Sequence, residues 1–567
     1  MPDAAAANPA VPEPDAAGER APRAAATLVV VRDAPGGIEV LLSRRAERGD
    51  HNSGAWVFPG GVVDAGDRAV HACCTGLDDA TASARLGIEA GGLDYYIAAV
   101  RECFEESGLL FAHDAAGALV QLEGATGAAL GAWRGPLHRG ERALGDLCRE
   151  FGLRLALGGV HYLSHWVTPP ARFKRFDTRF FVAAMPPAQT AAFDGTEMVE
   201  QLWLRPADAV AHSSDLKLLT PTRKTLELIG RYASVEALLA WAGSPRSVQM
   251  TMPRIATGSR GAQPVTPDEP AYAEIGRLDP QRAGTACYDI QPGVAVRLSS
   301  RVIRVTANNG SVMTGPGTNT YLVGGGAVNE WAVIDPGPLD QPHIDAVLAA
   351  APGPIRWIFV THTHRDHSPA AMALAARTGA ALFGRLPAHP EWQDESFAPG
   401  TLLEGGERFA LPADTTLHVI HTPGHASNHL CYLLEEEKLL FTGDHVMQAS
   451  TVVINPPDGD MAAYVASLRA LTELDLDWLA PGHGFLMAQP REAKQWVIGH
   501  RLRREAKVLA AVQAHGPAAA AALLATVYAD VPERMHPVAL RSLTAHLLKL
   551  RDDGAVAEAN GMWSPAA

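Results

Sequence analysis

The stretch 361-THTHRDH-367 places three histidines and an aspartate within seven residues. Crowded imidazole and carboxylate donors compete for partners unless a cation holds them, and unpaired polar groups are costly to bury. His362 and His364 alternate at the end of a predicted strand, whereas Asp366 and His367 follow where the chain turns. The two pairs can therefore point toward two adjacent positions, and the stretch predicts two metal sites.

Three more donors follow later predicted strands. They are His425 in 421-HTPGHASNH-429, Asp444 in 441-FTGDH-445 and His483 in 480-APGHG-484. Each is flanked by glycine, which lets the backbone approach its neighbours closely. Donors at the ends of strands that alternate with helices are typical of active sites in layered α/β folds.

This succession of motifs resembles the metallo-β-lactamase fold family. The resemblance implies that His362, His364 and His425 hold one metal, that Asp366, His367 and His483 hold a second, and that Asp444 bridges them. Zinc suits such ligands, and iron or manganese can replace it in this superfamily. Two cations lower the pKa of bound water enough to give a nucleophile at neutral pH, and we expect Asp366 to orient it.

Other polar residues near these motifs are expected to support the ligands. Asp335, in 333-VIDPG-337, stands where the family has an aspartate that steadies them. The histidines His421, His429 and His445 lie close to ligands in the sequence, but the ligand positions are already filled. We therefore predict packing or supporting roles for these three.

Residues 285–565 resemble the β-lactamase-like protein 2 branch of this family. The resemblance rests on 314-TGPGTNTYLVGGG-326, on the stretch THTHRDH, and on the tail from residue 480 to a terminal winged helix. Members of that branch include an endoribonuclease that cleaves single strands, whereas neighbouring branches hydrolyse thioesters. We expect thioester hydrolysis, and the alternative is phosphodiester cleavage of single-stranded RNA. No stretch resembles the insert domain of the RNA-processing β-CASP enzymes.

A second cluster of donors lies in 101-RECFEESGL-109, where Glu102, Glu105 and Glu106 share one face of a predicted helix. Together with 57-VFPGGVVDAGD-67 this stretch resembles the Nudix box, which Gly61, Arg101 and Gly108 also match. The resemblance implies that the three glutamates bind Mg²⁺ or Mn²⁺, that Glu102 and Glu105 are catalytic, and that Arg101 orients them. Asp67 stands where the box has glutamate, and the 33 residues 68–100 replace the usual seven.

The stretches 41-LLSRRAERGDHNSGAWVFPGG-61 and 166-WVTPPARFKRFDTRFF-181 resemble the peroxisomal coenzyme A diphosphatase branch of Nudix enzymes, over residues 25–242. Asp50 stands where that branch has arginine. We expect a diphosphatase that acts on a coenzyme A-like or nucleoside diphosphate-linked substrate, and the alternative is a nucleotide sensor without catalysis.

The resemblances and the change of composition at 243–270 predict a multidomain α/β and α+β chain. We expect a Nudix α/β/α sandwich, a metallo-β-lactamase αββα sandwich and a small winged helix. The expected bounds are a disordered leader 1–25, the Nudix domain 26–242, a linker 243–285, the metallo-β-lactamase-fold domain 286–490 and the helical and winged-helix domain 491–567.

The chain carries a formal net charge of -14, which argues against broad adhesion to nucleic acid or anionic membranes. Its six cysteines lack the spacing of a metal knuckle, and the first residues lack the apolar run of a secretory signal. We expect a cytoplasmic protein with small-molecule substrates such as acyl-CoA or nucleotides, and no membrane partner. The winged helix predicts either a homodimer or RNA binding through Arg501, Arg503 and Arg504 in 501-RLRREAK-507.

Overall fold

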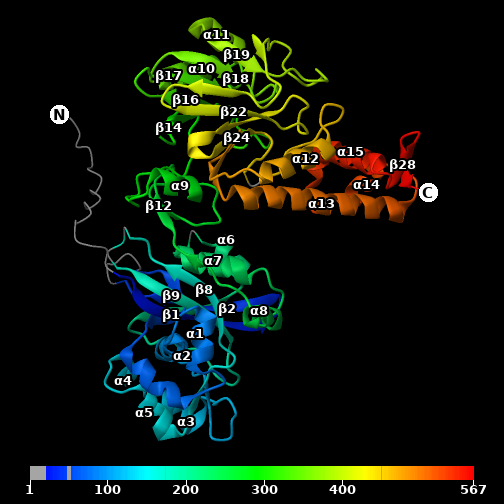
Figure 1. Cartoon of the computed structure of the whole chain (residues 1–567). Coiled ribbons are helices and arrows are strands. Elements are labelled where there is room, and N and C mark those ends of the chain that lie inside the picture. Colours follow the sequence, from blue (N-terminus) through cyan, green and yellow to red (C-terminus); the bar gives the residue numbers. More distant parts are fainter. Residues whose placement is uncertain are drawn as a thin grey trace, which may run out of the picture. The chain divides into compact units, whose positions relative to one another are not determined.

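The computed structural model describes residues 21–47, 53–170, 172, 174–213, 215–448 and 450–566, and they form two compact units, residues 1–255 and 256–567 (Figure 1). Most of the predicted leader, and Asp50, lie outside the described residues. The predicted domain boundaries stay predictions. Each unit is described below by itself.

A mixed sheet with the strand order β10-β2-β1-β9-β8-β11 forms the centre of the first unit. Its strands are β1 (Arg23–Ala34), β2 (Gly37–Arg45), β8 (His161–Val167), β9 (Phe176–Ala184), β10 (Met198–Leu204) and β11 (Met250–Thr251), and β3 (Trp56–Val57) and β4 (Gly60–Val62) pair with β2 and β1. β1 and β9 run parallel.

Alternate residues of β1 enter two cores on opposite faces of this sheet. Leu28 and Val30 pack with helix α2 (Gly92–Ser107), whereas Val29 and Val31 pack with residues of α6, α7 and α8. The covering helices are α6 (Pro206–Ala211), α7 (Thr220–Ile229) and α8 (Val235–Gly243). This arrangement confirms the predicted α/β/α sandwich.

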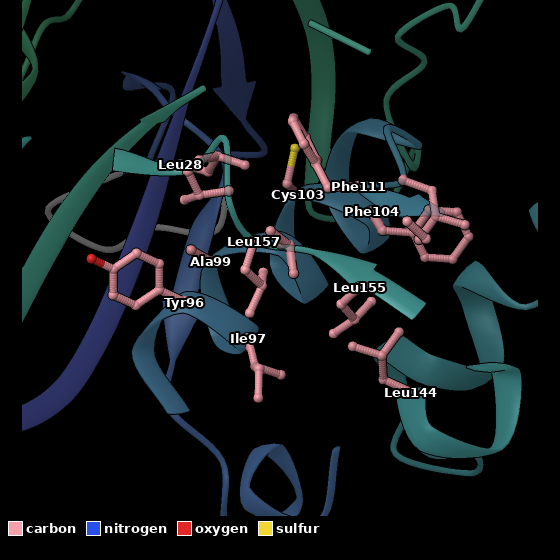
Figure 2. Packing of buried hydrophobic residues seen from close by; sticks show 14 of the residues in the cluster. Leu28, Tyr96, Ile97, Ala99, Cys103, Phe104, Phe111, Leu144, Leu155 and Leu157 are labelled. Atoms are coloured by element: carbon pink, nitrogen blue, oxygen red, sulfur yellow. The ribbon is translucent and has the colours of Figure 1, made fainter. Parts of the chain in front are cut away.

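The residues inserted into the Nudix box fold against α2. They form η1 (Ala65–Cys73), β5 (Cys74–Thr75), α1 (Asp79–Leu86) and the first turns of α2. Figure 2 shows Ile97 and Phe104 of α2 among Phe111, Leu144 and Leu155. The last three come from the region of β6 (Ala112–His113), α3 (Gly124–Gly131), α4 (Arg134–His138), α5 (Leu144–Phe151) and β7 (Arg154–Ala156). The insertion is therefore part of the core and not an open loop.

The segment 243–285, predicted as a linker, contains ordered elements. β11 extends the first sheet, β12 (Arg254–Ala256) pairs with β13 (Gln263–Val265), and α9 (Tyr272–Leu278) follows. Glu274 of α9 accepts two hydrogen bonds from Arg304, at 2.7 and 2.9 Å, and both side chains are buried. The elements are too short to show a period in the sequence, which is why the segment resembled a plain connection.

Two sheets face each other in the second unit. The first has the order β14 (Ala295–Arg297), β15 (Val302–Thr306), β16 (Asn319–Gly325), β17 (Glu330–Ile334), β18 (Ile355–Phe359), β19 (Ala381–Gly384) and β20 (Thr401–Leu402). The second has the order β21 (Arg408–Leu411), β22 (Thr415–His421), β23 (Leu430–Leu434), β24 (Leu439–Gly443), β25 (Trp478–Pro481) and β26 (Met487–Ala488).

Strand alternation again divides the side chains between two cores. Tyr321 and Val323 of β16 point between the sheets, whereas Leu322 joins the residues that pack with α10 (Gln341–Ala350) and α11 (Ala371–Thr378). Helices α12 (Met461–Thr472) and α13 (Pro490–His515) contribute to the core on the outer face of the second sheet. The four layers confirm the predicted αββα sandwich.

Helix α13, drawn in orange in Figure 1, leads from this sandwich to the last domain. That domain consists of β27 (Ala518–Ala519), α14 (Ala520–Val527), η3 (Glu533–Met535), α15 (His536–Asp552), β28 (Val556–Ala559) and β29 (Met562–Pro565), with the sheet order β27-β29-β28. The predicted winged helix is confirmed. In the part of the chain that the structure describes, no helix has the length and apolar character needed to cross a membrane.

Candidate functional sites

All seven predicted ligands of the second unit meet at one edge of its two sheets. His362, His364, Asp366 and His367 follow β18, His425 follows β22, Asp444 follows β24 and His483 follows β25. Their donor atoms form three overlapping groups that could hold metal: His362, His364 and His425; His362, His367 and Asp444; and Asp366, His367 and His483.

Three histidines converge on the first position. Nδ1 of His364 lies 2.9 Å from Nε2 of His362 and 3.0 Å from Nε2 of His425. Burial lowers the pKa of all three imidazoles, to about 3 for His364. Neutral imidazoles with converging nitrogens are suited to a cation such as zinc.

The second position is more acidic. Nε2 of His367 and Nε2 of His483 each lie 3.4 Å from Oδ2 of Asp366. Oδ1 of Asp444 lies 3.5 Å from the first imidazole and 3.2 Å from the second. Burial disfavours charge at His483, but Asp444 and Asp366 outweigh it and raise the pKa of this imidazole to about 9.

Asp444 lies between the two positions. Its Oδ1 faces His367 and His483, whereas its Oδ2 lies 3.7 Å from Nε2 of His425. Oδ1 of Asp444 and Nε2 of His367 are buried without a hydrogen-bond partner among the described residues. Two such orphaned atoms that face each other fit a cation that would bind both.

The far side of three of the ligand imidazoles is held by a hydrogen bond. Nδ1 of His367 donates to Asp335 at 2.9 Å, Nδ1 of His425 to the carbonyl of Val453 at 2.7 Å, and Nδ1 of His483 to the carbonyl of Gly317 at 3.1 Å. In the neutral form of each ring these bonds keep the proton on Nδ1, so that Nε2 can bind a cation once its own proton is displaced.

Asp335 occupies the supporting position that the sequence predicted. It also accepts hydrogen bonds from the amide and the hydroxyl of Thr361, at 2.7 and 2.8 Å. That hydroxyl oxygen in turn lies 3.0 Å from Nδ1 of His362. Asp335 therefore connects both histidine sets, and it does so from a backbone φ of 51°, a conformation that costs energy for a residue other than glycine.

The glycines beside the ligands permit this packing. A Cβ atom on Gly482 would lie 2.8 Å from Oδ1 of Asp444 and 2.8 Å from Cε1 of His367. A Cβ atom on Gly424, whose φ is +140°, would lie 2.3 Å from the backbone of Tyr464. Substitution of either glycine would displace a ligand or the helix behind it.

The three additional histidines lie outside the groups of donor atoms. His429 is buried, its Nε2 accepts from the amide of Asp444 at 3.2 Å, and its Nδ1 contacts the Thr422 hydroxyl at 2.9 Å. His421 contacts the carbonyl of Ser427 at 3.1 Å. His445 is buried against Tyr464, with a ring separation of 4.9 Å. These contacts agree with packing and supporting roles.

In the first unit, α2 presents its three glutamates beside β4. Gly60 donates its amide to Glu106 at 3.0 Å, and Arg101 contacts Glu102 at 2.8 Å and Glu105 at 3.4 Å. A Cβ atom on Gly61 would lie 2.3 Å from Oε1 of Glu102. The glycine is therefore needed for the close approach of the helix to the strand.

Burial raises the pKa of these carboxyl groups, well above its usual range for Glu106 and to about 7 for Glu105 despite the attraction of Arg101. Repulsion from Glu102 adds to both shifts. Carboxyl groups that are buried close together lose their protons less readily, because their negative charges would repel one another. A divalent cation such as Mg²⁺ would offset this repulsion, so the cluster is suited to bind one.

Two polar residues near these glutamates, His138 and Glu197, were not predicted from the sequence. Nδ1 of His138 lies 3.8 Å from Glu105, and its Nε2 lies 3.8 Å from Glu197, which forms an ion pair with Arg45 at 2.8 Å. Glu197 is close enough to raise the pKa of Glu102 and Glu106. Neither residue has a fixed spacing from the Nudix box, so no signal in the sequence could have identified it.

RNA binding, one of the two alternatives for the winged helix, stays a prediction, but two of its three arginines, Arg501 and Arg504, do not offer their charges at the surface. Both side chains are buried, and Arg504 pairs with Asp530 at 2.7 Å and packs on Tyr528. Only Arg503 of the three is exposed. The signal was present in the sequence, because Val497, Arg501, Arg504 and Val508 share the spacing of one helix face.

Comparisons with known proteins agree with this division. Residues 313–483 match the metallo-beta-lactamase superfamily, residues 78–228 match the NUDT19 Nudix domain, and residues 519–563 match the beta-lactamase associated winged helix domain.

Two relatives and one solved structure illustrate the similarity. The chain is 32% identical over 273 residues to the beta-lactamase-like protein 2 homolog of Caenorhabditis elegans, covering 46% of this chain and 87% of the relative. It is 31% identical over 275 residues to the atrochrysone carboxyl ACP thioesterase of Aspergillus chevalieri, covering 46% and 84%. A Nudix hydrolase structure from Alicyclobacillus acidocaldarius is 28% identical, with a TM-score of 0.34, covering 39% and 97%.

Proposed function

We propose that this chain, which belongs to the metallo-beta-lactamase superfamily as a homologue of β-lactamase-like protein 2 and carries a NUDT19-type Nudix domain, hydrolyses an acyl thioester at its histidine–aspartate centre. The observation that carries the proposal is the position of Asp444, whose two oxygens face two separate sets of histidines. Support for the substrate class comes from a relative that is named as an ACP thioesterase.

The proposed ligands follow from the donor atoms. His362, His364 and His425 would hold one ion, Asp366, His367 and His483 the other, and Asp444 would bridge them. Such ions supply Lewis-acid activation of water and of a carbonyl group when bound. Zinc, iron and manganese all suit these ligands.

Asp366 is the residue that we expect to orient the attacking water. Its side chain is 26% exposed, against 12% for Asp444, so it is the ligand carboxylate more open to solvent. The hydroxyl of Thr318 donates to Asp366 Oδ2 at 3.3 Å and limits its rotation. A carboxylate held in this way can accept the proton of a water molecule that attacks the thioester carbon.

For the Nudix half we propose cleavage of a diphosphate in a coenzyme A-like or nucleoside diphosphate-linked substrate. Glu102, Glu105 and Glu106 would hold Mg²⁺ or Mn²⁺, and Arg101 would keep them in place. The contact between Asp67 and Arg101 supports an intact site, because the altered box still pairs its arginine with a carboxylate. If the two units hydrolyse related molecules, one at a thioester and the other at a diphosphate, this relationship would explain why they are joined in one chain.

A substrate panel tests both proposals. The purified chain would be incubated with acyl-CoA, free coenzyme A, ADP-ribose and single-stranded RNA, and the products identified by mass. We expect thiol release from acyl-CoA and Mg²⁺-dependent cleavage of a diphosphate. Cleavage of RNA without thiol release would contradict the thioester proposal, and intact diphosphates in every reaction would contradict the diphosphatase proposal.

A further inference from the structure

We infer that α13, which leads to the winged-helix domain, and α15, which belongs to it, support the metal centre because they hold the segment that orients His425. This inference rests on the proposed metal site and is independent of the substrate that is cut there. It assigns a positioning role to Arg501, a residue that neither metal position contacts.

Three consecutive residues, 452–454, carry the connection. Arg501 of α13 donates a hydrogen bond to the carbonyl of Val452. The carbonyl of Val453 accepts from Nδ1 of His425 at 2.7 Å, and the amide of Ile454 donates to the hydroxyl of Ser542 on α15 at 3.3 Å. The carbonyl that fixes a ligand therefore lies between two residues that are each bonded to a C-terminal helix.

The surroundings make this segment a packed part of the protein. Val452 and Ile454 are buried in the same core as Ala545 of α15 and Val497 of α13. Arg501 is 3% exposed, and its guanidinium lies 5.2 Å from the ring centre of Tyr464, whose hydroxyl donates to the carbonyl of His445. Replacement of Arg501 by an apolar side chain would leave the carbonyl of Val452 without its donor in a dry environment.

The orientation of His425 depends on this segment. Its Nδ1 proton is donated to Val453, which leaves the lone pair of Nε2 directed at His364 and Asp444. Loss of a hydrogen bond that orients a metal-binding imidazole commonly weakens metal affinity about 10- to 100-fold. A displacement of residues 452–454 would act first on His425, because His367, His362 and His483 are held by Asp335, Thr361 and Gly317.

Arg504 provides a matched control. It lies on the same helix, is also buried, and like Arg501 contacts a carbonyl, that of Val527, and a tyrosine ring, that of Tyr528, with an ion pair to Asp530 in addition. None of these partners touches residues 452–454. A comparison of Arg501→Met with Arg504→Met thus separates an effect on the metal site from a general loss of stability of the C-terminal helices.

The test measures Zn²⁺ affinity by competition with a chelator in the full chain, together with thermal unfolding. We expect Arg501→Met to weaken the affinity of one of two Zn²⁺ ions about tenfold, and Arg501→Lys, which keeps a donor, to recover most of it. Arg504→Met should lower the unfolding temperature by a similar amount and leave both affinities unchanged. Equal Zn²⁺ affinity in Arg501→Met and the wild type, or equal losses in the two Met variants, would overturn the inference.

Amide hydrogen exchange in the metal-free chain supplies a second readout. Residues 445–460 should exchange faster in Arg501→Met than in Arg504→Met, because only the first variant releases the carbonyl of Val452. Unchanged exchange in this segment would also overturn the inference. A wild type that binds no Zn²⁺ would contradict the proposed metal centre, whereas the exchange comparison would still decide whether Arg501 holds the segment.

Discussion

The guanidinium of Arg101 forms an ion pair with the carboxylate of Asp67, Nε to Oδ1 2.8 Å, across the 33 residues that lie between Asp67 and Arg101. A second bond joins Nη2 of the arginine to Oδ2 at 3.3 Å. Asp67 is buried and also accepts from the amide of Asp64. The ion pair joins the residue before the insertion to α2. It therefore holds the two parts of the Nudix motif next to each other in space, although the insertion separates them in the sequence.

Asp67→Ala should therefore destabilise the first unit and disturb its glutamates together. Loss of a buried hydrogen bond between charged groups costs about 2 kcal/mol, and Arg101 keeps its contacts with Glu102 and Glu105. The free energy of unfolding from a denaturant titration checks this value. A loss below about 0.5 kcal/mol, as for an exposed pair, would show that the pair does not hold the insertion.

Glu105→Gln combined with Glu106→Gln should abolish Mg²⁺-dependent diphosphate cleavage. The amides keep the shape of the side chains but lose the charges that we propose to bind the cation. Thioester hydrolysis should remain at the wild-type rate, since it belongs to the other unit. Parallel loss of both activities would mean that the two sites are not independent.

Affinity for Mg²⁺ should depend on pH through Glu105. Its pKa is raised to about 7 in the metal-free protein, so below that pH a proton competes with the cation for the carboxylate. Affinity should rise with pH through about 7, by roughly tenfold per unit for one displaced proton, and it should keep rising above that pH because the pKa of Glu106 is raised as well. Isothermal titration at several pH values measures it, and an affinity that falls with rising pH would contradict this assignment.

Asp335→Asn should weaken metal binding without removing a ligand. The amide cannot accept from His367 and Thr361 in the way that the carboxylate does, and loss of such support costs about 10- to 100-fold in affinity. Asp340→Asn, a nearby exchange outside the donor groups, serves as the control. Equal Zn²⁺ affinity in both variants would show that Asp335 does not steady the ligands.

The parts of the site that follow strands could be predicted from the sequence. Each of four ligands follows a strand that could be recognised by its apolar residues, so the strand ends bring them to one edge of the sheets. These ligands are His362, His425, Asp444 and His483. Glu197 and residues 452–454 could not be predicted, because their contacts join distant segments without a fixed spacing. The burial of Arg501 could be predicted from its helical spacing with Val497, Arg504 and Val508, although its charge favours an exposed position.

The central claim is that the histidine–aspartate centre hydrolyses an acyl thioester. The most direct test is to incubate acyl-CoA with the Glu105→Gln, Glu106→Gln variant, in which we expect no diphosphatase activity, and to identify the products. We predict release of the free acid and the coenzyme A thiol. His362→Ala combined with His364→Ala should reduce this rate to background and remove the bound metal. Intact acyl-CoA in the presence of a fully metal-loaded protein would contradict it.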